Sequence, residues 1–208
     1  MTALTALFAI KLAYTAFMAV LIPVYLRQYG LTNFLYFCDL ALLFTLAGLW
    51  LDEPLLISMS AVGLLLPQTL WVVDFIANLF GYRTTGLTNY MFEAHRSRFL
   101  RGLSLFHGWL PFLLLYLVWE MGYDSRAFWA WTAVSCIVLP ICYFFMPPAQ
   151  PDPGMTPVNI NLVWGFDDRK AQTWMSPHAW FALLFFGLPI AVYWPTHLLL
   201  QYFSKAAE

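Results

Sequence analysis

Four side chains that can do acid–base or nucleophilic chemistry lie within long apolar stretches, where ionisable groups are costly. They are Cys38, Asp39, Asp74 and His107. An ionisable group inside a membrane-spanning segment marks a functional site by default. A histidine that takes the proton of a thiol activates it as a nucleophile, and a carboxylate can orient the resulting imidazolium. These residues predict a catalytic site with Cys38 as nucleophile and His107 as general base, where Asp39 or Asp74 orients the histidine or binds substrate.

Two other kinds of site use the same residue types. Asp39, Asp74, His107 and His178 form a mixed carboxylate–imidazole set that suits Zn, Mn or Fe. The sequence contains no HxxxH or ExxH spacing to support a metal enzyme, so a site without cofactor is the first expectation and a divalent metal the alternative. The remaining alternative is a non-enzymatic membrane protein or small transporter, in which Asp39 and Asp74 bind a cation or a proton. Cys38 is then a small buried apolar residue.

The composition places these residues in a membrane protein. Of 208 residues, 62% are apolar and only 10% are charged, whereas soluble domains average roughly 45–50% and 25%. A net charge of −1 with ten scattered Lys and Arg excludes a nucleic-acid partner. Three cysteines without a CxxC pair exclude a disulfide framework and a cysteine zinc site. The chain is expected to be an all-α bundle in the lipid bilayer.

Six stretches are long and apolar enough to cross the roughly 30 Å hydrocarbon core as helices. They are Leu4–Leu26, Phe34–Leu51, Leu55–Phe80, Leu100–Trp119, Phe128–Met146 and Ala179–Phe203. We therefore expect one six-helix transmembrane domain over residues 1–208, in which a proline-rich loop over residues 147–178 connects the last two helices. The sequence predicts no oligomeric state.

The distribution of basic residues predicts the orientation. Six crossings put both termini on one side of the membrane and loops 1, 3 and 5 on the other. Most basic side chains fall in those three loops: Arg27, Arg83, Arg96, Arg98, Arg101, Arg169 and Lys170. The positive-inside rule then makes loops 1, 3 and 5 of this cell-membrane protein cytoplasmic and places both termini outside.

The polar residues converge at the membrane face that carries the long loops. Cys38 and Asp39 lie roughly 6–8 Å inside the second segment at 1.5 Å per residue, and Asp74 reaches a similar depth from the third. Further polar side chains fall at the same end: Asn33, Asn78, His95, Asn159, Asn161 and His178. Of these, Asn33, Asn78, Asn161 and His178 are the predicted substrate-binding residues. A Cys–His pair just under the interface meets the ester carbonyls of phospholipids, which favours lipid acyl transfer or lipid-ester hydrolysis.

Short motifs add a resemblance to a known family. The stretch Asn33-Phe-Leu-Tyr-Phe-Cys38-Asp39-Leu-Ala-Leu, Leu105-Phe106-His107-Gly108 and Ser176-Pro177-His178-Ala179-Trp180 occur in this order. They resemble motifs of the YwaF-like integral membrane proteins, which are related to Cys–His membrane acyltransferases. The resemblance implies a polytopic helical fold, with Cys38 in the position of the nucleophile and His107 in that of the base. The family pattern usually has a histidine two residues before the cysteine, where this chain has Tyr36.

Overall fold

The described residues, 3–82, 84–93 and 96–205, fold into helices and connecting loops without any strand in this computed structural model. The α-helices are α1 (Ala3–Gln28), α2 (Phe37–Leu51), α3 (Pro54–Leu79), α4 (Arg98–Ser104), α5 (Phe106–Met121), α6 (Ala127–Phe145), α7 (Pro177–Leu188) and α8 (Trp194–Lys205). Three short 3-10 helices lie in the connections: η1 (Leu31–Leu35), η2 (Asn89–Phe92) and η3 (Ile160–Leu162). The expected all-α bundle is confirmed.

Five helical segments are long and apolar enough to cross a membrane. They are Thr5–Gln28, Pro54–Leu79, Arg98–Met121, Ala127–Phe145 and Pro177–Ser204. The fourth expected helix is thus α4 followed by α5, and the sixth is α7 followed by the π-helical turn η4 (Pro189–Tyr193) and α8. The second expected helix begins later than predicted, at Phe37, because η1 occupies the preceding residues. With 15 residues, α2 is about 22 Å long.

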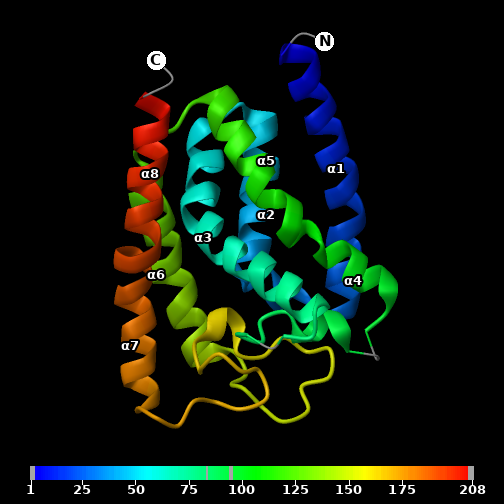
Figure 1. The fold of residues 1–208 in the computed structure, drawn as a ribbon, viewed down its shortest axis with the longest axis vertical. Helices are drawn as coiled ribbons and strands as arrows, with labels where there is room; N and C mark the ends of the chain where they lie inside the picture. The colour runs from blue at the N-terminus through cyan, green and yellow to red at the C-terminus, as the bar shows by residue number, and fades with distance from the viewer. Residues whose placement is uncertain (1–2, 83, 94–95, 206–208) are drawn as a thin grey trace.

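Helix α3 is the centre of the bundle and contacts α2, α5, α6 and α8. Against α6, Gly63 of α3 faces the fully buried Trp131 indole. A Cβ at position 63 would overlap that ring, so the two helices can meet only because residue 63 has no side chain. Figure 1 shows that α1 begins and α8 ends at the upper end of the bundle, whereas the long connection between α6 and α7 lies at the lower end.

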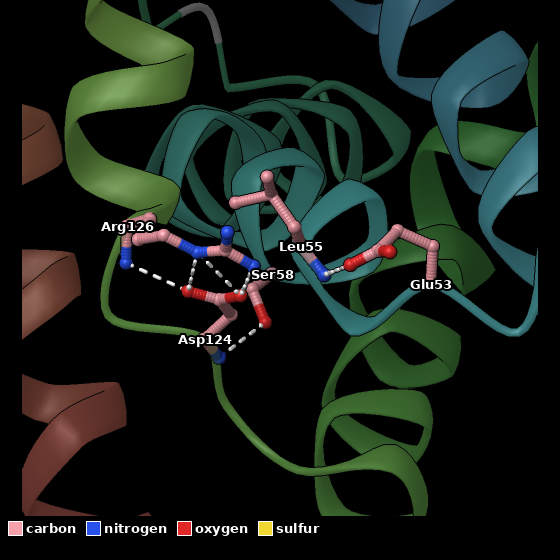
Figure 2. A network of polar contacts seen from close by, with 5 residues as sticks. All are labelled: Glu53, Leu55, Ser58, Asp124 and Arg126. Atoms are coloured by element: carbon pink, nitrogen blue, oxygen red, sulfur yellow. Dashed lines mark hydrogen bonds and ion pairs between the residues drawn. The ribbon is translucent and has the colours of Figure 1, made fainter.

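At the upper end, several charged side chains bind one another or cap helices. Asp124 forms an ion pair of 2.6 Å with Arg126, and its N–H donates to the buried Ser58 hydroxyl of α3 (Figure 2). Glu53 accepts from the N–H of Leu55 and so caps the beginning of α3 (Figure 2). Lys11 of α1 lies 2.5 Å from the Asp52 carboxylate between α2 and α3. The short turns at this end are therefore fastened by local polar contacts.

Candidate functional site

Asp74, near the end of α3, is enclosed by the loop that follows its own helix. Its side chain is 1% exposed, and both carboxylate oxygens accept hydrogen bonds. Oδ1 accepts from the Thr84 hydroxyl, from the N–H and hydroxyl of Thr85, and from the N–H of Gly86. Oδ2 accepts from the N–H of Thr88 at 2.8 Å, from its hydroxyl at 2.6 Å, and from the Asn78 amide at 3.4 Å.

These hydrogen bonds give Asp74 a structural role. A carboxylate offers about four lone-pair positions, and this one receives three backbone N–H groups, three hydroxyls and one amide. Asn78 also donates to the Thr88 hydroxyl at 2.8 Å. Asp74 and Asn78 thus anchor the loop, and their surroundings lend no support to the predicted catalytic, metal-binding or substrate-binding roles.

Asp39 lies in the first turn of α2 and has a different environment. Its side chain is 3% exposed. Oδ2 accepts a hydrogen bond of 2.8 Å from the Asn33 amide of η1. The other oxygen, Oδ1, is buried and has no hydrogen-bond partner among the described residues. A buried polar atom without a partner is rare in proteins and calls for an explanation.

Two tyrosine side chains lie near this site: Tyr36, directly before α2, is near Cys38 and Asp39, and Tyr90 is near Cys38. Burial raises the pKa of Tyr36 well above its usual range, and the nearby Asp168, Cys38 and Asp39 add to this rise. Burial also raises the pKa of Tyr90 in η2, and the Cys38 thiol again contributes. Both phenols therefore keep their protons at neutral pH, and the Tyr36 hydroxyl donates to the Val158 carbonyl at 3.2 Å.

Arg96 lies over the rings of Tyr29 and Tyr90 and forms no ion pair with Asp39. Its guanidinium group is 5.8 Å from the Tyr29 ring centroid and 5.3 Å from that of Tyr90. It donates to the Tyr29 hydroxyl at 3.3 Å and forms an ion pair of 3.1 Å with Glu93. Among the ion pairs of the described residues, none involves Asp39. The ion pair of Arg96 therefore leads to Glu93 and not to Asp39.

The predicted nucleophile and base do not bond to each other. Cys38 is half-buried, and none of the hydrogen bonds of the described residues joins it to His107. The Nδ1 atom of His107 is 2.8 Å from the Ser104 carbonyl oxygen, and the ring stacks on Trp71 at 4.9 Å and on Phe106 at 4.0 Å. Because a carbonyl oxygen only accepts, Nδ1 carries a proton and Nε2 is left as the ring's acceptor. The Cys–His pairing stays a prediction.

Asn161 and His178 hold the long loop in place. The Asn161 side-chain oxygen accepts from the N–H of Phe37 at 2.9 Å, and its amide donates to the Leu35 carbonyl at 2.9 Å. It thereby caps one of the unpaired N–H groups at the beginning of α2. The exposed His178 pairs through Nδ1 with the Tyr143 hydroxyl at 3.0 Å. Both residues have structural contacts, and their predicted roles in substrate binding stay predictions.

The alternative metal site gains no geometric support. Within residues 3–82, 84–93 and 96–205, no group of three or more His, Cys, Asp and Glu side chains is arranged to hold a metal ion. Asp39, Asp74, His107 and His178 each have the separate contacts described above. His95 and Arg83, which the sequence places at the same face, lie outside the described residues.

Sequence reasoning missed the loop residues Thr84-Thr85-Gly86-Leu87-Thr88 that surround Asp74. A run of small hydroxyl residues around a glycine soon after a helix is a signal for such a turn, because Gly86 adopts φ +82°. It also assigned no role to Tyr36, which lies two residues before Cys38, or to Tyr90, which only the tertiary structure brings near Cys38. Compared with known proteins, the chain matches no family model, no curated protein and no solved structure.

Proposed function

We propose that this chain is a non-enzymatic multi-pass membrane protein, of a transporting or sensing kind, that binds and releases a proton at Asp39. One observation carries the proposal: Asp39 Oδ1 is buried without a hydrogen-bond partner, while Oδ2 is held by Asn33. Asp74, the other carboxyl group of the predicted site, is fully occupied by its loop, so the proposal concerns Asp39 alone.

A proton suits this carboxyl group better than a metal ion. An unpaired charge buried away from water is costly, and protonation removes it without requiring further ligands. A divalent ion instead needs several ligands, and the described residues offer no such group. Asn33 can donate to Oδ2 in both protonation states, so the carboxyl group stays in place when the proton leaves. The phenols of Tyr36 and Tyr90 supply neutral polar groups nearby.

Arg96 offers a route to couple proton release to the loops. Its positive charge is close enough to Tyr36 and Tyr90 to oppose the rise in the pKa of both phenols. Its ion pair with Glu93 extends to Arg169 of the long loop, whose guanidinium group is 3.0 Å from the other Glu93 oxygen. The charges of Asp39 and Arg96 both act on the Tyr36 phenol, so this phenol connects proton release at Asp39 to the ion pairs of the loops.

Infrared spectroscopy of the protein in lipid bilayers tests the proposal. The wild type is expected to show a carboxylic acid C=O band that shifts in D2O and disappears as the pH is raised. Asp39→Asn should remove the part of that band that comes from the buried Asp39, whereas Asp152→Asn, at an exposed loop position without described contacts, should leave that part unchanged. A titrating band of equal size in the Asp39→Asn protein would overturn the proposal.

The Cys38→Ser variant distinguishes the enzymatic alternative from a proton site at Asp39. A proton site at Asp39 predicts that this variant keeps the titrating band, and that the wild type forms no acyl-enzyme with a lipid-ester probe. Labelling that is lost in both Cys38→Ser and His107→Ala, together with an unchanged band in Asp39→Asn, would favour the acyltransferase or hydrolase instead.

A further inference from the structure

We propose that Arg98 and Arg101 bind the phosphate of an anionic phospholipid in a shallow pocket at the end of the bundle that carries the long loops. The pocket has a volume of about 330 Å³ and is formed by α3, η2 and α4. Its basic residues are Arg98 and Arg101, and its apolar walls include Phe75, Phe92 and Leu105. The proposal is independent of Asp39.

The two arginines have positive charge that no described carboxylate neutralises. Arg98 is exposed and forms no hydrogen bond or ion pair within residues 3–82, 84–93 and 96–205. Arg101 donates one hydrogen bond of 3.2 Å to the Met91 carbonyl, and its Nε is buried without a partner. A guanidinium group has five N–H donors, so most donors of this pair remain available for an anion.

Three other arginines are paired with carboxylates, whereas Arg27 has no partner among the described residues but lies outside the pocket. Arg96 and Arg169 share the Glu93 carboxylate, at 3.1 Å and 3.0 Å. Arg126 binds Asp124 at 2.6 Å. Carboxylates are thus paired with arginines along the loops and turns, and Arg98 and Arg101 stand apart from them while facing one pocket. A negatively charged ligand would neutralise the positive charge of this pocket.

The apolar walls identify the ligand as a lipid and not free phosphate. Phe75 of α3 stacks on Phe92 of η2, with ring centroids 5.7 Å apart. Phe92 is 45% and Leu105 is 44% exposed, so apolar surface continues from the arginines along the membrane-spanning segment. Arg98 begins the candidate span Arg98–Met121, which puts the guanidinium groups at the depth of lipid headgroups. Phosphate contact by arginine and acyl-chain contact by aromatic rings then occur together.

Native mass spectrometry of the detergent-purified protein tests this site with phosphatidylglycerol and phosphatidylcholine as probes. The wild type is expected to bind phosphatidylglycerol more tightly. Arg98→Gln should weaken that binding about fivefold, since one arginine near a membrane surface contributes about a factor of five. The matched control is Arg27→Gln, which removes an equal charge from an exposed position in the last turn of α1, outside the pocket.

Arg101→Lys provides a second variant that keeps the charge but loses the planar set of donors, and it should weaken phosphatidylglycerol binding less than Arg98→Gln does. Equal binding of the two lipids by the wild type would overturn the proposal, and so would equal losses in Arg98→Gln and Arg27→Gln. Competition by inorganic phosphate at the same concentration as the lipid would also overturn it, because the pocket would then be a free-phosphate site.

Discussion

Asp39 and Asp74 are two carboxyl groups buried at the same end of one helical bundle, yet their surroundings are opposite. Asp74 is 1% exposed and both its oxygens accept several hydrogen bonds. Asp39 is 3% exposed, and one of its oxygens has no partner in the described chain. Residue type and depth are the same, so the neighbouring donors decide what each carboxyl group does.

The difference has a local cause. After α3, the chain turns back at once and brings Thr84, Thr85 and Thr88 to Asp74 within 14 residues. Before α2, the chain offers only the Asn33 amide, six residues from Asp39. Backbone N–H groups and hydroxyls that converge on a carboxylate favour its charged form. Asp74 therefore shapes a loop, and Asp39 is left with capacity for a ligand.

The largest expected effect is that of Asp74→Asn on stability. The amide has one acceptor oxygen, and its NH2 group meets hydroxyl and N–H donors that need an acceptor. Because hydrogen bonds to a charged group contribute about 1.5–3 kcal/mol each, we expect a loss of about 3 kcal/mol or more of unfolding free energy. Unfolding in detergent measures this loss, and hydrogen exchange should accelerate at residues 84–88.

Thr88→Val provides a graded comparison for that experiment. It removes one hydroxyl that lies 2.6 Å from Oδ2 and keeps the shape of the side chain, so the loss should be smaller than that of Asp74→Asn. If Asp74→Asn left both stability and exchange at residues 84–88 unchanged, the description of Asp74 as the anchor of its loop would be wrong.

An intermediate effect is expected for Asn161→Ala, which acts on the same end of α2 as Asp39. The variant loses the bonds to the Phe37 N–H and the Leu35 carbonyl, and a lost cap costs about 0.5–2 kcal/mol. Hydrogen exchange should rise at residues 35–37 and stay unchanged at residues 84–88. Protection at residues 35–37 equal to that of the wild type would show that the long loop does not hold this helix end.

The fold was largely predictable because apolar length is a strong signal in membrane proteins. All six apolar stretches are mainly helical, and the long loops coincide with the proline-rich and polar segments. The beginning of α2 was not predictable to the residue, since Phe34 and Leu35 are as apolar as the helix itself but form part of η1. Hydropathy reports transfer into lipid and does not distinguish a 3-10 turn from the helix that follows.

The site was less predictable, since it depends on which partner each polar side chain finds. The sequence identified Asp39, Asp74, Asn33 and Asn78 as residues at one depth, and the structure pairs Asn33 with Asp39 and Asn78 with Asp74. It did not show which carboxyl group remains unsatisfied. Nor did it place Asn161 against Phe37, a contact across 124 residues. Such contacts depend on how the helices and loops pack, which periodicity does not encode.

The smallest expected effect on stability is that of Asp39→Asn. This variant tests whether Asp39, unlike Asp74, contributes little to the fold. The amide oxygen can still accept the Asn33 hydrogen bond, while the group with an unpartnered buried oxygen is replaced by a neutral one. We therefore expect a change of at most about 1 kcal/mol in unfolding free energy, of either sign. The measurement is the same detergent unfolding used for Asp74→Asn. A carboxyl group that is kept for a ligand contributes little to the stability of the fold. A loss as large as that of Asp74→Asn would therefore show that Asp39 anchors the structure, as Asp74 does.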